Sequence, residues 1–204
     1  MKLDIKKFYP SIDQEILKRD IIRRKIKDKK LLVILDEIID SVHMDNVYAK
    51  NKDLLLEDRV VGGVPIGNYL SQFFANLYLA YFDHWVKEEL KCKFYYRYAD
   101  DIVILSNDKN YLHNILVAIK LYLKQVLNLE LKPNYQIFNV EIRGIDFVGF
   151  VFRHQYILLR KALKLRIKKL INKYINYKIS KNQFKMRFVS YLGWLKYSNS
   201  KNLA

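Results

Sequence analysis

A chain of 204 residues with 51% hydrophobic side chains can fill one large core or two small ones, which favours a folded protein. The excess of 37 Lys and Arg over 21 Asp and Glu gives a net charge of +16, which favours a polyanionic partner such as nucleic acid. A lysine-rich solvated surface is the alternative explanation of that charge. The single cysteine, Cys92, excludes an internal disulfide and a cysteine-built zinc site. Because the sequence has no apolar run of about 18 residues and no secretory signal, we expect a cytoplasmic protein without membrane contact.

The first part of the chain predicts one strand followed by two helices. Residues 2–8 have a strand-like composition, and Pro10 to Asp13 then supply a break and N-cap candidates for a helix that continues through Ile21. Residues 30–42 carry apolar side chains at helical spacing and predict the second helix.

The middle of the chain predicts a loop and two further helices. Residues 51–67 lose periodicity and end in GGVPIG, whose glycines allow a close approach to a ligand. Residues 68–90 contain no Gly or Pro, and their apolar stripe predicts one long helix, which we assign to the core. Residues 111–127 predict another amphipathic helix.

A pair of adjacent acids lies between two short apolar segments. Residues 94–98 and 102–105 predict a hairpin with Asp100 and Asp101 at its tip, where like charges repel each other. A divalent cation is the usual reason for such a pair, and Mg²⁺ prefers carboxylate oxygens. Asp4, at the end of the first predicted strand, could supply a third carboxylate. The alternative is a polar hairpin turn without a metal.

The C-terminal part predicts two strands and then basic helices. Residues 135–140 and 145–152 have strand character, with Gly144 as the turn between them. Residues 161–204 alternate Lys, Arg, Ile, Leu and Tyr at helical spacing, and Ser180 is a candidate cap for a new helix. These residues predict a separate helical subdomain.

Several segments together resemble reverse transcriptases in content and order. The resemblance spans nearly the whole chain, and it is closest to the enzymes of diversity-generating retroelements because the second block reads Ile-Gly-Asn followed by Ser-Gln. The matching segments are LDIKKFYPSI (3–12), GVPIGNYLSQ (63–72) followed by FFANLYL (73–79), YADD (98–101), LKP (131–133), RGIDFVGF (143–150) and GWLK (193–196).

The resemblance implies an α+β fold, the palm of a right-hand polymerase with a C-terminal helical thumb. The palm is an antiparallel, ferredoxin-like sheet backed by helices. We expect it over residues 1–152, with a partial fingers insertion at about 15–62, and we expect the thumb over 153–204. Fingers strands normally precede the first block, which begins here at Leu3, so the N-terminal fingers are expected to be largely missing.

The same resemblance implies the catalytic residues. Asp4, Asp100 and Asp101 would be the catalytic carboxylates and would hold two Mg²⁺ ions, with Mn²⁺ as a substitute. The backbone carbonyl of Ile5 would be a further metal ligand. Lys132 would be a general acid for the leaving pyrophosphate, although in so lysine-rich a chain a solvated lysine is the alternative.

The first two blocks would also bind the nucleotide. Tyr9 would pack under the sugar and exclude a ribose 2′-hydroxyl, whereas ordinary packing is the alternative for Tyr9 and Phe8. Ile66 replaces the glutamine of many reverse transcriptases and offers only apolar contact, so we hypothesise error-prone copying opposite template adenines. The implied substrate-binding residues are Ile5, Phe8, Tyr9, Ile66, Gly67, Ser71 and Gln72.

The C-terminal part would hold the template and primer. The hairpin over Phe147 to Phe152 would grip the primer end, and the basic helices after Lys161 would rest on the duplex backbone. A plain edge hairpin and a solvated helical bundle are the alternatives. The implied template–primer residues are Phe147, Gly149, Lys164, Arg166, Lys168, Lys169 and Trp194.

The expected partners are an RNA template with a DNA or RNA primer, deoxynucleoside triphosphates and a small basic helical accessory protein, in a bacterial or phage-infected cell. Two alternatives stay open at this point. The chain could be a group II intron-like, retron-like or phage-defence reverse transcriptase. It could also be a catalytically idle fragment that binds nucleic acid.

Overall fold

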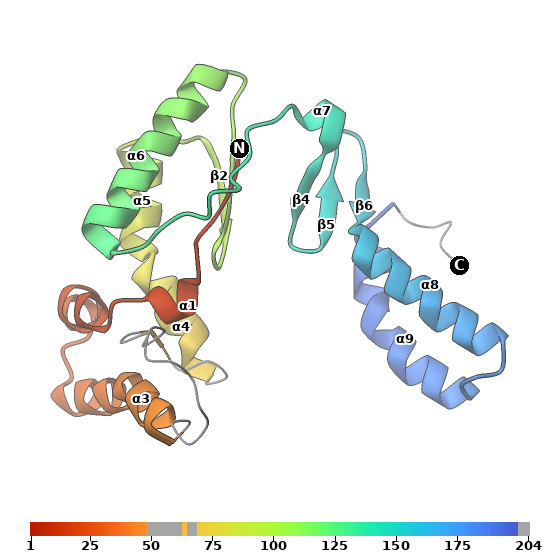
Figure 1. Cartoon of the computed structure of the whole chain (residues 1–204), viewed down its shortest axis with the longest axis horizontal. Helices are drawn as coiled ribbons and strands as arrows, with labels where there is room; N and C mark the ends of the chain where they lie inside the picture. The colour runs from red at the N-terminus through yellow and green to blue at the C-terminus, as the bar shows by residue number, and fades with distance from the viewer. Residues whose placement is uncertain (49–62, 65–68, 200–204) are drawn as a thin grey trace. The chain divides into compact units, whose positions relative to one another are not determined.

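The chain forms two compact units, Met1–Ile137 and Phe138–Ala204, in a computed structural model that describes residues 1–48, 63–64 and 69–199 (Figure 1). Both units combine strands and helices, as the expected α+β class requires. Among the helices of the described residues, none is long and apolar enough to cross a membrane.

The N-terminal unit is built on a three-stranded antiparallel sheet. Its strands are β1 (Lys2–Asp4), β2 (Phe94–Tyr98) and β3 (Asp101–Leu105), in the order β1-β3-β2. The predicted hairpin of β2 and β3 is confirmed, with Tyr98 opposite Asp101. On the other edge of β1, backbone bridges join the residue pairs Lys2–Gln136 and Ile5–Leu131.

Helices cover this sheet and supply most of its core. Phe82 in one helix lies 6.4 Å, between ring centroids, from Tyr95 of β2 and 5.5 Å from Tyr122 in a second helix. Phe82 and Tyr95 belong to the buried core and Tyr122 packs against it, so the helices and the sheet share one apolar interior. The helical elements are α1 (Phe8–Ser11), the π-helix η1 (Ile16–Ile22), α2 (Arg23–Lys25), α3 (Lys29–Tyr48), α4 (Tyr69–Tyr78), α5 (Ala80–Glu88) and α6 (Lys109–Leu127).

Two expectations for the N-terminal unit are wrong. The strand predicted over 2–8 ends at Asp4, because Lys7 takes a left-handed conformation, with φ of 45°, and α1 begins at Phe8. The single helix predicted over 68–90 is two helices, because Leu79 leaves the helical conformation with ψ of 1°. Leu79 is fully buried, so the core stabilises this break, which periodicity alone does not reveal.

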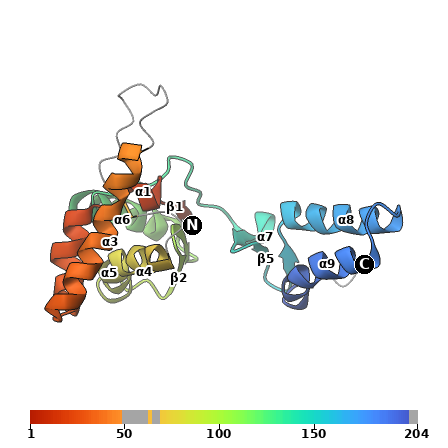
Figure 2. The same cartoon turned by 90° about the horizontal axis from the view of Figure 1, so that it is seen from below.

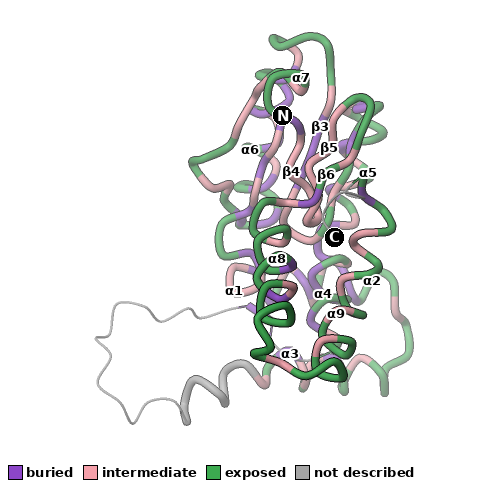
Figure 3. The backbone as a smooth tube through the Cα atoms, turned by 90° about the vertical axis from the view of Figure 1, so that its right-hand side faces the viewer, coloured by how far each residue is buried: buried purple, intermediate pink, exposed green. Residues whose placement is uncertain are grey.

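The C-terminal unit has a second antiparallel sheet followed by two helices. Its elements are α7 (Val140–Arg143), β4 (Ile145–Phe147), β5 (Phe150–Phe152), β6 (Ile157–Leu159), α8 (Lys161–Ile175) and α9 (Lys181–Lys196). Helices α8 and α9 lie side by side (Figures 1 and 2). Much of their backbone belongs to exposed residues, as the green tube shows (Figure 3). The predicted cap is confirmed, since Ser180 and Gln183 form a reciprocal capping box at the start of α9.

The strand predicted over 135–140 is wrong, and so is the turn predicted at Gly144. Residues 140–143 form α7, and Gly144 terminates that helix with φ of 76°. The turn between β4 and β5 is formed by Val148 and Gly149, which both have positive φ as a tight antiparallel hairpin requires.

The predicted division between palm and thumb at 152/153 differs in position from the division between compact units at 137/138. Backbone hydrogen bonds tie the second sheet to its helices, from Arg160 N–H to the carbonyl of Gly149 at 2.9 Å and from Asn199 N–H to that of Ile157 at 2.7 Å. The 145–152 hairpin is therefore packed with α8 and α9. The functional boundary at 152/153 stays a prediction.

Gly149 is required by a close contact with Trp194. A Cβ atom on Gly149 would lie 2.4 Å from the indole ring, and its φ of 81° is one that side chains rarely adopt. The Trp194 ring also lies 5.1 Å from that of Phe150, so the turn and α9 are packed together.

We expect Gly149→Ala to lower the stability of the C-terminal unit by about 2 kcal/mol or more, because the methyl group meets the indole in a strained backbone. The measurement is urea unfolding followed by tryptophan fluorescence in a Trp85→Phe background, in which Trp194 is the only tryptophan. Gly193→Ala is the matched control. A Cβ there meets nothing within 4 Å, and in a helix it should stabilise by about 0.5–1 kcal/mol. Equal midpoints for the two variants would contradict this account of Gly149.

Candidate active site

Three acidic residues meet at one end of the first sheet. Asp4 is the direct cross-strand partner of Asp101, and Asp100 precedes it in the turn between β2 and β3. The N–H of Ile5 donates to the backbone carbonyl of Asp100 at 3.2 Å, which ties the first block to the turn. Segments almost 100 residues apart in sequence thus bring their acids together.

Two lysines, one in β1 and one in the segment beside it, neutralise two of these acids. Lys132 Nζ lies 2.7 Å from Asp4 Oδ1, and Lys2 Nζ lies 3.4 Å from Asp101 Oδ1. The contact with Asp4 is the largest influence that raises the pKa of Lys132, so this amine stays protonated at neutral pH. Burial, and then the charges of Asp4 and Asp101, raise the pKa of Asp100. The site therefore concentrates negative charge that cations compensate.

The donor set fits a hard divalent cation. Asp4 Oδ1 is buried and lies 2.7 Å from Lys132 Nζ, so a cation compensates the charge of this carboxylate. Carboxylate oxygens without nearby His or Cys suit Mg²⁺. Within the described ranges, no three His, Cys, Asp or Glu side chains are gathered tightly enough to form a metal cluster.

Tyr9 and Phe8 lie next to the acids. Phe8 is buried, and its ring centroid lies 5.5 Å from that of Tyr9. Burial, followed by the nearby charges of Asp100 and Tyr98, raises the pKa of Tyr9. The Tyr9 side chain therefore interacts electrostatically with the Asp100 carboxylate.

Gly63 and Val64, at the start of the second sequence block, pack against residues of the first block. Gly63 has φ of 93°, and a Cβ there would lie 2.8 Å from the Cα of Pro10. The N–H of Val64 donates to the carbonyl of Tyr9 at 3.2 Å. The buried Gln14 side chain donates to the carbonyls of Gly63 at 2.8 Å and Ile39 at 3.1 Å. These contacts explain why a glycine occupies position 63.

Four predicted nucleotide contacts belong to this second block. Ile66 and Gly67 lie outside the described residues. Ser71 is buried in α4, whereas Gln72 on the same helix is exposed.

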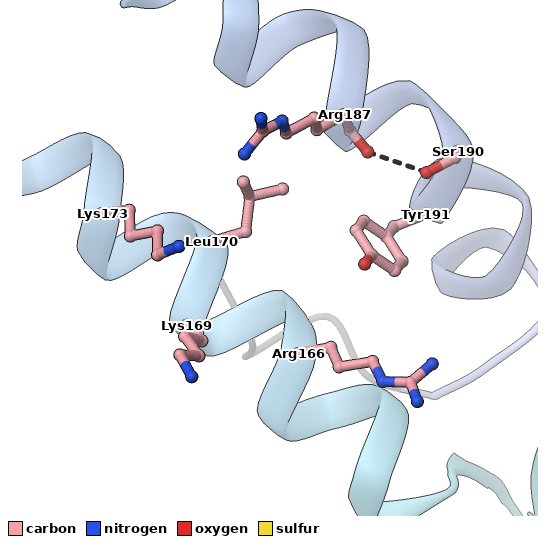
Figure 4. A pocket seen from close by; sticks show the side chains of 7 residues that line it. All are labelled: Arg166, Lys169, Leu170, Lys173, Arg187, Ser190 and Tyr191. Atoms are coloured by element: carbon pink, nitrogen blue, oxygen red, sulfur yellow. Dashed lines mark hydrogen bonds between the residues drawn. The ribbon is translucent and has the colours of Figure 1, made fainter. Parts of the chain in front are cut away.

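The predicted template–primer residues all lie in the C-terminal unit. Residues 138–204 contain fifteen Lys and Arg but only two acidic residues, so this unit carries +13 of the net charge of +16. Between α8 and α9 lies a groove of about 320 Å³ that Arg166, Lys169 and Arg187 help to line (Figure 4). Lys164 and Lys168 are exposed on α8. Trp194 packs against Gly149, in the turn of the hairpin that contains Phe147.

Sequence reasoning missed Lys2 and Arg97. Lys2 pairs with Asp101, and Arg97 donates to the backbone carbonyl of Ala99, the residue before the acid pair, at 3.0 Å. A charged residue within an aromatic strand is a signal for Arg97, since such a side chain needs a partner when it is buried.

The comparisons with known proteins agree with this geometry. The sequence profile of the family described as reverse transcriptase (RNA-dependent DNA polymerase) matches residues 1–194. No match was found among curated proteins. A profile match over almost the entire chain implies a palm-like polymerase fold, with which the acid-bearing antiparallel sheet is compatible. The chain therefore belongs to the reverse transcriptase family, and its enzyme class is RNA-directed DNA polymerase, a nucleotidyltransferase.

Proposed function

We propose that Asp4, Asp100 and Asp101 are the catalytic carboxylates of this polymerase and that it uses two-metal nucleotidyl transfer. The observation that carries the proposal is the cross-strand pairing of Asp4 with Asp101, beside the turn that holds Asp100. The pairing of the buried Asp4 Oδ1 with the Lys132 ammonium at 2.7 Å adds support, because a carboxylate that attracts one cation is also a suitable ligand for a metal ion.

The three carboxylates and the carbonyl of Ile5 would hold two Mg²⁺ ions, or Mn²⁺ as a substitute. When bound, the ions would activate the primer hydroxyl and stabilise the leaving pyrophosphate. Tyr9 would support the sugar and exclude the ribose 2′-hydroxyl, and Phe8 would hold the Tyr9 ring in place. Gly67, Ser71 and Gln72 complete the proposed nucleotide-binding set.

Lys132 is the proposed general acid. Its amine is protonated and now neutralises Asp4, and an incoming triphosphate would compete for the same ammonium group. From that position Lys132 would donate a proton to the leaving pyrophosphate.

In the proposed complex, residues 1–152 act as the palm with a partial fingers insertion, and residues 153–204 act as the thumb. The thumb would neutralise phosphates of an RNA template and its DNA or RNA primer, and the charge of +13 on residues 138–204 supports this role. Phe147, Gly149 and Trp194 would grip the primer end. Lys164, Arg166, Lys168 and Lys169 would contact the duplex backbone without reading its sequence.

The proposed biological setting is a diversity-generating retroelement that acts in the cytoplasm with a small basic helical accessory protein. The sequence Ile66-Gly67-Asn68 supports this choice over a group II intron-like, retron-like or phage-defence enzyme. An idle nucleic-acid-binding fragment is the alternative of a different class, and the acid geometry favours the enzyme.

We expect Asp100→Asn to abolish Mg²⁺-dependent primer extension on RNA while template–primer affinity stays within about twofold, because the basic surface is unchanged. The folded protein holds the Asp100 proton more tightly than the unfolded chain does, so stability falls as pH rises through the raised pKa. The amide removes this penalty, and without metal the variant should melt at or above the wild-type temperature at pH 7. Extension assays, binding titrations and thermal melts measure the three quantities.

The control for Asp100→Asn is Glu37→Gln, which removes an equal charge from an exposed position on α3. It should leave extension unchanged. Extension by Asp100→Asn at the wild-type rate would refute the catalytic assignment, and a large fall in its melting temperature would refute the electrostatic account.

We expect Tyr9→Ala to raise the incorporation of ribonucleotides relative to deoxynucleotides by at least about tenfold, because removing the ring opens space for a 2′-hydroxyl. Single-nucleotide kcat/KM values with matched ribose and deoxyribose substrates measure this ratio. Tyr81→Ala, at an exposed aromatic of α5, is the control. An unchanged ratio for Tyr9→Ala would remove Tyr9 from the sugar pocket.

We expect Ile66→Gln to lower misincorporation opposite template adenine, because an amide can hydrogen-bond where Ile66 offers only apolar contact. Sequencing of products copied from a defined RNA measures the error rate at each base. Equal error rates for the wild type and the variant would argue against the low-fidelity hypothesis and against the retroelement setting, while leaving the polymerase assignment intact.

A further inference from the structure

The turn that carries Asp100 is held in a conformation that its sequence does not favour. Tyr98 and Asp101 are paired, so Ala99 and Asp100 form a two-residue connection between β2 and β3. Ala99 has φ of 49°, in the left-handed region that favours glycine. For a residue with a Cβ this conformation is unfavourable, so other contacts must stabilise it.

Both backbone carbonyls of this connection accept hydrogen bonds from residues outside it. The carbonyl of Asp100 accepts from the N–H of Ile5 at 3.2 Å. The carbonyl of Ala99 accepts from Arg97 Nη1 at 3.0 Å, and this is the side-chain donor that fixes the left-handed residue. Of these two contacts, the one at Ala99 is made by a side chain, the Arg97 guanidinium.

That guanidinium is itself fixed by two helices. Arg97 Nε and Nη2 donate to the two carboxylate oxygens of Asp83 on α5, at 2.7 and 2.5 Å, and Nη1 also donates to Asn76 Oδ1 on α4 at 3.1 Å. The Tyr95 hydroxyl donates to Asp83 Oδ1 at 2.6 Å. Burial raises the pKa of Tyr95, so this hydroxyl remains a donor. The Arg97 side chain is only 9% exposed.

A partly buried ion pair adds little net stability over apolar residues of the same volume, because both charges lose part of their hydration. Its geometric effect is larger, since the planar fork of an arginine fixes several acceptors at once. Here one fork joins α4, α5 and the turn at Ala99. A role in geometry explains this arrangement better than a role in stability.

We propose that Arg97 is a positioning residue that holds the Ala99 carbonyl, and through it the Asp100 carboxylate, in the orientation needed for metal binding. This inference rests on the proposed function, because it assumes that Asp100 binds the metal. Arg97 itself touches neither substrate nor metal in this proposal. Asp83, Asn76 and Tyr95 hold Arg97 in place.

The test uses Arg97→Lys in the full chain. Lysine keeps the charge that Asp83 requires, so the fold should survive, but a single ammonium group cannot replace the fork that reaches both Asp83 and the Ala99 carbonyl. The readouts are Mn²⁺ binding by electron paramagnetic resonance on the protein with template–primer, Mg²⁺ half-saturation, kcat and KM in primer extension, template–primer affinity and melting temperature. The matched control is Arg19→Lys, because Arg19 forms an exposed two-point pair with Asp20.

We expect Arg97→Lys to weaken Mn²⁺ binding and to raise the Mg²⁺ half-saturation concentration by about tenfold, the effect typical of residues that orient a metal ligand. The kcat should fall, while the KM for nucleotide and the template–primer affinity stay within about twofold of wild type. Adding Ala99→Gly should restore much of the loss, because glycine adopts positive φ without strain. A purely structural role for Arg97 predicts no such rescue.

Wild-type metal dependence in a folded Arg97→Lys variant would overturn the proposal. Loss of its melting transition would also overturn it, since the fork would then be needed for the fold itself. Failure of the wild type to extend a primer would count against the proposed function. The comparison of Mn²⁺ binding between wild type and variant would still decide whether Arg97 positions the turn.

Discussion

The pairing of β1 with β3 is the constraint on which the rest of the site depends. Leu3 and Ile102 are cross-strand partners and are both almost fully buried, whereas Asp4 and Asp101, one residue further along, lie at the sheet end that carries the acids. A slip of one residue would exchange the two faces of β1, placing Asp4 in the core and Leu3 in solvent. Hydrophobic burial therefore fixes the position of the acids, although the acids contribute nothing to that burial.

The same pairing creates an electrostatic problem, which neighbouring lysines solve. Three carboxylates meet at one end of a sheet, and burial, followed by the charges of Asp4 and Asp101, raises the pKa of Asp100. Lys2 from β1 and Lys132 from the segment on its other side each neutralise one acid. Because both contacts are partly exposed, a divalent cation or a triphosphate can compete for the same charges. The lysines stabilise the site without closing it.

Local patterns predicted local structure, and tertiary contacts account for the errors. The β2–β3 hairpin and the Ser180 cap follow from alternation and capping, which act over a few residues. The break at Leu79 depends on core packing, and β6 is a three-residue strand that propensity alone does not reveal. The adjacent acids were conspicuous in the residue pattern, and the resemblance implied their role. The partners of Arg97 come from α4 and α5, so no local pattern could reveal them.

The unequal division of charge follows from what each unit would have to bind. Residues 138–204 carry +13, whereas the acid-bearing residues 1–137 carry only +3. A unit that concentrates carboxylates for cations gains nothing from a strong positive field, because that field repels the same cations. A unit that holds a nucleic acid backbone gains from each added lysine through counterion release. Strong positive charge is thus compatible with a cation site in one chain when most of it belongs to a different compact unit.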